Sequence, residues 1–169
     1  MVLGHLPVGY IISKMLFRTI KDRQVKYRTF MFWGLFGSVA PDTDMIYYYL
    51  FDYRQYSHHQ YVTHFPLLWL FFLLLSFVWI LFHKKWGQYP VYAVIFTLGG
   101  FVHILMDTIV GGSMLLLAPF DYRHFCLVPH VPWDATQYKF LSYGLEAILI
   151  LWAVLIWLKI RVHSEVNRA

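Results

Sequence analysis

The sequence has little cysteine and little charge. Its 169 residues include one cysteine, Cys126, which excludes an internal disulfide and a cysteine-rich zinc site. Charged residues make up 14% of the chain, against roughly 25% in a soluble globular domain. Residues 1–17 also lack the features of a cleavable signal peptide, because they have no charged start and Lys14 interrupts the apolar run.

Apolar and aromatic residues dominate instead, at 59% and 21% of the chain. This composition predicts an all-α fold, namely a multi-pass transmembrane helical bundle that forms a single membrane-embedded domain over residues 1–169. We expect about five membrane segments. They are residues 5–17, 29–51, 65–82, 89–119 and 140–158.

The segments differ in how regular they are. Residues 65–82 carry no charge, and 18 residues of helix rise about 27 Å, close to the ~30 Å hydrocarbon core. The second segment is expected to be broken at Pro41, which lacks a backbone donor and disfavours helical geometry at Ala40. Residues 89–119 are too long for one helix, and Gly99-Gly100 with Gly111-Gly112-Ser113 predict a helix, a break and a short apolar return.

Basic residues occur in alternate connections between the segments. These connections hold Arg18, Lys21, Arg23, Lys26 and Arg28 after the first segment, Lys84 and Lys85 after the third, and Lys159, Arg161 and Arg168 after the last. By the positive-inside rule they are cytoplasmic, which places the other ends of the segments on the outer side of the membrane. The basic residues that produce the net charge of +5 thus act as topology signals. No nucleic-acid partner is expected.

Histidine and aspartate residues in the apolar segments are candidate metal ligands. His103 and Asp107 are four residues apart, so a helix places them on one face. Asp42 and Asp44 follow Pro41; one carboxylate alone could cap a helix, but two so close repel unless a cation lies between them. An unpaired carboxylate at membrane depth is costly, which favours a functional role over a structural one.

Further histidines complete the predicted site. His59 and His64 lie in a connection that could also be a plain polar loop, and His58 is the weakest candidate there; neutral imidazole is a common metal ligand. His5 is uninformative by itself. The predicted metal ligands are His5, Asp42, Asp44, His59, His64, His103 and Asp107. The cofactor expected is a divalent metal, zinc before manganese or iron, on the extracytoplasmic side.

Other polar residues suggest catalytic and substrate roles. Asp44 and Glu146 are the candidate general base or acid, although Glu146 could equally be a buried group bonded to the backbone. Arg54 and Arg123 could hold an anionic substrate, but arginines at such positions often contact lipid headgroups instead.

In this order the motifs resemble the YdjM-type family of inner-membrane metal-dependent hydrolases. That family shows an N-terminal His, a Pro-Asp-x-Asp box, a His-Arg-Gly-x-Thr-His box, and His-x3-Asp before an apolar segment with Gly and Pro. Here they appear over about residues 1–120 as His5, Pro41-Asp42-Thr43-Asp44, His59-Gln60-Tyr61-Val62-Thr63-His64, His103-Ile104-Leu105-Met106-Asp107 and Gly112 to Pro119-Phe120. Gln60 and Tyr61 depart from the family's Arg and Gly. The His-x3-Asp element is also more loosely similar to zinc-dependent phospholipases C.

The resemblance implies a metal-dependent hydrolase of the inner (plasma) membrane. We expect it to act on an ester or phosphoester at the outer face, in a membrane lipid, another lipid-linked molecule or a small molecule. One alternative is a divalent-metal or proton transporter. Another is a non-catalytic membrane adaptor with a structural metal, in which the loop between Arg18 and Arg28 binds a cytosolic partner or anionic lipid.

Overall fold

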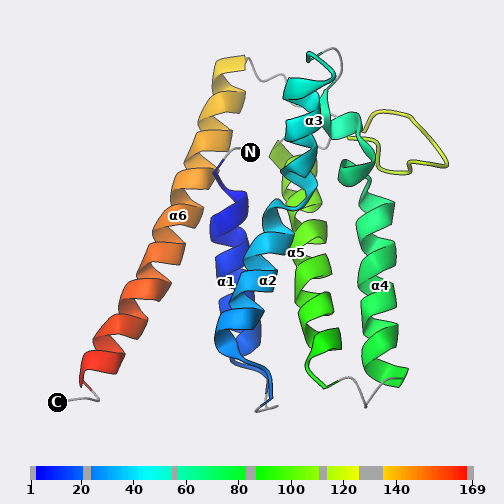
Figure 1. Cartoon of the computed structure of the whole chain (residues 1–169). Helices are drawn as coiled ribbons and strands as arrows, with labels where there is room; N and C mark the ends of the chain where they lie inside the picture. The colour runs from blue at the N-terminus through cyan, green and yellow to red at the C-terminus, as the bar shows by residue number, and fades with distance from the viewer. Residues whose placement is uncertain are drawn as a thin grey trace.

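The computed structural model describes residues 3–20, 24–54, 57–82, 87–110, 114–125 and 135–166. Figure 1 shows a bundle in which α4 and α6 lie at opposite sides, with α1, α2 and α5 between them. The helices are α1 (His5–Phe17), α2 (Tyr27–Val39), α3 (Asp44–Leu50), α4 (Pro66–Phe82), α5 (Tyr89–Val110) and α6 (Ala135–Val166), with 3-10 turns η1 (Pro41–Thr43), η2 (His58–Gln60) and η3 (Val62–His64). The β pairing in these ranges is an isolated bridge between Met114 and Phe125, so the all-helical prediction is confirmed.

The second predicted segment is broken at the expected place. Helix α2 ends at Val39, and Pro41 opens η1, which leads into α3. The expectation that Ala40 leaves the helical region is wrong, because its φ and ψ are −60° and −37°. The chain tightens into a 3-10 turn instead, in which the Thr43 N–H donates to the Ala40 carbonyl. The break therefore needs no unusual backbone angle at Ala40.

Two described helices are long and apolar enough to cross a membrane, over Tyr89–Ile109 and Lys139–Lys159. Helix α4 is apolar but shorter, at 17 residues. Helix α5 continues through Gly99 and Gly100, so these two glycines do not break it. The predicted break at Gly111-Gly112-Ser113 lies outside the described residues. Several basic residues on which the predicted topology rests also lie outside the described residues, namely Lys21, Arg23, Lys84, Lys85 and Arg168. The Arg161 side chain is likewise outside the described part of the structure.

Small residues bring α2 close to α5. A Cβ added to Gly99 would lie 2.8 Å from the Ser38 backbone nitrogen and 2.9 Å from the Gly34 carbonyl oxygen. Such a distance is shorter than any packed Cβ contact, so only glycine permits this approach. The consequence is that the last turn of α2 lies directly against the middle of α5.

Helix α6 packs mainly on α1 and exposes apolar side chains elsewhere. Val8 and Ile11 of α1 form a buried cluster with Leu149 of α6. Leu151 and Trp152 of α6 are exposed, as expected for a helix that faces lipid.

Candidate metal centre

Helix α5 supplies the base of the site. His103 and Asp107 lie one turn apart and are both almost fully buried, with the His103 Nε2 3.1 Å from the Asp107 Oδ2. The His103 Nδ1 lies 2.7 Å from the Ser38 carbonyl oxygen. Because a carbonyl only accepts, Nδ1 carries the proton in this pair, and Nε2 presents its lone pair to the site.

The broken second segment brings Asp42 over these two residues. Its Oδ1 lies 3.5 Å from the His103 Nε2 and 3.6 Å from the His64 Nε2. The 3-10 turn that starts at Pro41 thus places a carboxylate between a helical and a loop histidine. The Asp42 side chain is 31% exposed, whereas its partners are buried, so the site opens on this side.

The turns η2 and η3 place two more imidazoles in the site. The His64 Nδ1 lies 2.6 Å from the Asp44 Oδ2, and its Nε2 lies 3.9 Å from the Asp107 Oδ2. The His59 Nε2 lies 3.8 Å from the same Asp107 oxygen. Burial lowers the pKa of His59 to about 4, so at neutral pH this imidazole is in the neutral form that binds metals.

His5, at the start of α1, closes the site from the other side. Its Nε2 lies 3.3 Å from the Asp107 Oδ1. Its ring stacks on the His103 ring, with centroids 3.6 Å apart and an angle of 14° between the planes. The N-terminal helix thus contributes a second imidazole beside the one from α5.

These side chains fit a divalent cation. Three groups have ligand atoms that all lie within 4.8 Å of one another: His58, His59 and His64; His5, Asp42 and His103; and His64, His103 and Asp107. The Nε2 atoms of His64 and His103 are buried and make no hydrogen bond to any described residue. Mixed imidazole and carboxylate donors without thiolate suit zinc, and also manganese or iron.

Residues 1–165 match the family model of the YdjM inner membrane protein. The chain belongs to the YdjM family. No curated protein and no solved structure matches the chain. The resemblance inferred from the motifs is therefore confirmed, and membership supports a membrane location for this YdjM family protein.

Within this YdjM family site, the predicted ligands other than Asp44 converge. Asp44 lies behind His64, where its Oδ2 accepts hydrogen bonds from the His64 Nδ1 and the Thr63 hydroxyl. His58, ranked lowest from the sequence, lies in the cluster, with its ring centroid 4.1 Å from that of His59.

The remaining predicted residues make other contacts. Glu146 of α6 is buried, and its Oε1 accepts a hydrogen bond from the Leu3 N–H at 3.4 Å. Arg54 places its guanidinium over the Tyr49 ring, 4.8 Å from the centroid. Arg123 has an 89% exposed side chain paired with Asp121. Their predicted catalytic and substrate roles stay predictions.

Three supporting residues were missed from the sequence. The Ser38 carbonyl orients His103, and Thr63 bonds Asp44. The Trp69 indole N–H donates to the Thr63 carbonyl at 2.7 Å, which fixes η3 to α4. Thr63 could have been found, because it lies inside the quoted Thr-His motif; a backbone oxygen such as that of Ser38 leaves no signal in the sequence.

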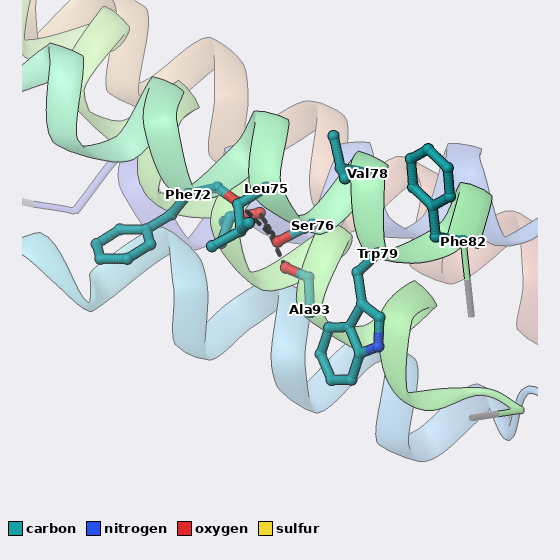
Figure 2. A pocket seen from close by; sticks show the side chains of 8 residues that line it. Phe72, Leu75, Ser76, Val78, Trp79, Phe82 and Ala93 are labelled. Atoms are coloured by element: carbon teal, nitrogen blue, oxygen red, sulfur yellow. Dashed lines mark hydrogen bonds between the residues drawn. The ribbon is translucent and has the colours of Figure 1, made fainter. Parts of the chain in front are cut away.

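A large apolar hollow of the YdjM family protein lies away from these ligands. Figure 2 shows it along α4 and α5, with Phe72, Trp79 and Ala93 among its lining residues, and its volume is about 540 Å³. Its hydroxyls are satisfied locally, since Ser76 donates to the Phe72 carbonyl and Thr97 to the Ala93 carbonyl. Thr97 precedes Asp107 by ten residues on α5, roughly 15 Å along the helix.

Proposed function

We propose that this protein is a membrane-bound metal-dependent hydrolase that cleaves an ester or phosphoester bond, in a lipid-linked or small-molecule substrate. The observation that carries the proposal is the convergence of two buried, unbonded imidazole nitrogens, those of His64 and His103, on the carboxylates of Asp42 and Asp107. When bound, a divalent cation polarises the scissile bond and lowers the pKa of a water molecule.

Each residue has a definite part in this proposal. His64, His103, Asp42 and Asp107 hold the cation, most favourably zinc, and His5 and His59 are further ligands that the same cluster offers around Asp107. The partly exposed side of Asp42 is where substrate enters. Asp44 holds the His64 ring through Nδ1, a contact that fixes the tautomer and directs Nε2 to the site.

The proposed topology has five passes with the metal site on the extracytoplasmic side. Helices α5 and α6 are long enough to span, while α4, α1 and the broken α2–α3 segment would complete the passes. Arg18, just after α1, and Arg28, in the first turn of α2, lie at the opposite end of α1 from His5. The positive-inside rule assigns this end to the cytoplasm. A site at the outer surface of the bilayer suits a substrate with a lipid tail.

Two observations favour a hydrolase over the rival functions. A transporter needs polar groups that continue to the opposite end of the bundle, but the hydroxyls of Ser76 and Thr97 bond the carbonyls of their own helices. A purely structural metal site is coordinatively closed, whereas Asp42 lies at a partly exposed edge. A cytosolic partner at the loop between Arg18 and Arg28 belongs to the adaptor alternative.

Elemental analysis of the detergent-purified protein tests the proposal, beside the His103→Ala/Asp107→Ala double variant. We expect near-stoichiometric zinc, manganese or iron in the wild type and none in the variant. The loaded wild type should hydrolyse a chromogenic ester or phosphodiester or release a phospholipid headgroup, and the variant should not. A folded wild type that takes up no metal after reloading, or equal turnover in both proteins, would refute the assignment.

A further inference from the structure

We infer that the cluster holds two cations bridged by Asp107, one beside His103 and the other beside His5. The inference rests on the proposed metal site and specifies its substrate, because two adjacent cations suit the in-line displacement of a phosphoester. It comes from the stacking of two imidazoles and from the way in which one carboxylate divides its oxygens between them.

The stacked rings of His5 and His103 do not favour a shared ion. A metal bonds an imidazole nitrogen along the lone pair, in the plane of the ring. The two rings are nearly parallel, with centroids 3.6 Å apart, and both Nε2 atoms approach the same carboxylate, so their lone-pair axes run side by side. An ion midway would lie about 1.8 Å out of both ring planes, nearly the whole of a zinc–nitrogen bond of about 2.1 Å.

Asp107 is arranged to bridge two ions. Its Oδ1 lies 3.3 Å from the His5 Nε2, and its Oδ2 lies 3.1 Å from the His103 Nε2. One oxygen is thus available to each position. The ring separation of 3.6 Å also matches the spacing of about 3.5–4 Å between the ions of two-metal hydrolytic sites.

The position beside His103 has enough ligands of its own. The Asp42 Oδ1 lies 3.5 Å from the His103 Nε2 and 3.6 Å from the His64 Nε2, and the His64 Nε2 lies 3.9 Å from the Asp107 Oδ2. Ligands around a tetrahedral zinc are about 3.4 Å apart for bonds of about 2.1 Å. These four residues therefore suffice for one ion, which leaves His5 and the Asp107 Oδ1 for another.

The metal content of three full-length proteins tests the inference. Wild type, His5→Ala and the control His124→Ala, which replaces an exposed histidine, are stripped with a chelator, reloaded with Zn²⁺ and analysed for metal per chain. We expect two equivalents in the wild type and the control, and one in His5→Ala. In parallel, wild type loaded with Mn²⁺ should give the electron paramagnetic resonance spectrum of an exchange-coupled pair, and His5→Ala that of an isolated ion.

The outcomes separate this inference from the proposed function. One equivalent in the wild type, or two without magnetic coupling, overturns the bridged pair but leaves a metal-dependent hydrolase standing. No bound metal in the wild type removes both. Should His5→Ala fail to fold, the wild-type stoichiometry and its Mn²⁺ spectrum still decide the question, since neither depends on the variant.

Discussion

At the residue scale, Asp44 determines how His64 is presented. Its Oδ2 accepts hydrogen bonds from the His64 Nδ1 and the Thr63 hydroxyl, so the other ring nitrogen of His64 faces the site. We expect Asp44→Asn to weaken cation binding by roughly 10–100-fold without changing the stoichiometry, as loss of an outer-shell partner typically does. Competition with a fluorescent chelator measures this affinity.

The matched control is Asp52→Asn. Asp52 lies in the connection between α3 and η2 and accepts a hydrogen bond from the Tyr61 hydroxyl at 2.6 Å. This variant removes a carboxylate charge near the site without touching the His64 ring, so its affinity should stay at the wild-type value. A lost equivalent of metal in Asp44→Asn would instead make Asp44 a direct ligand, as the sequence suggested.

Some contacts of the site could be predicted from the sequence and others could not. The pairing of His103 with Asp107 follows from helical spacing alone, and Asp42 from the position of Pro41. The contact between Asp44 and His64 could not be predicted, because it depends on how η2 and η3 fold back over α3. Short turns of this kind have no periodicity that fixes the direction of a side chain.

At the element scale, the close approach of α2 to α5 holds the Ser38 carbonyl against His103. We expect Gly99→Ala to destabilise the protein by about 1–3 kcal/mol, because the new methyl group would push the two helices apart. The melting temperature in detergent should fall, and metal affinity should fall with it as His103 loses its anchor.

The control is Gly144→Ala on α6, where an added Cβ would meet nothing within 4 Å. Alanine is favoured over glycine inside a helix by roughly 0.5–1 kcal/mol, so this variant should melt at the wild-type temperature or slightly above it. A Gly99→Ala protein that melts like Gly144→Ala would show that the contact between α2 and α5 tolerates a wider spacing.

Helix limits were predictable where a particular residue such as Pro41 ends the helix. They were less predictable where only the hydropathy changes. The predicted limits 5–17 coincide with α1, and the break at Pro41 is in place. Helix α6 runs over Ala135–Val166, well beyond the predicted 140–158. Hydropathy marks the apolar middle of a helix, whereas the backbone continues through the polar residues on either side.

At the scale of the whole molecule, elements far apart in the chain build the site at one end of the bundle. The start of α1, the turn after α2, the turns before α4 and the last part of α5 meet there (Figure 1). The sequence predicted this common end from the alternation of basic connections. It did not predict the stacking of His5 on His103, because contacts between segments distant in sequence depend on the packing of the intervening helices.

The side of the membrane that this end faces can be determined by cysteine labelling. In a Cys126→Ser background, a single cysteine replaces either Thr19, an exposed residue of the basic connection, or His124, an exposed residue between α5 and α6. A membrane-impermeant maleimide should label His124→Cys in intact cells and Thr19→Cys only after lysis, because the positive-inside rule assigns the basic connection to the cytoplasm. The reverse pattern would place the metal site on the cytoplasmic face and exclude a substrate in the outer leaflet.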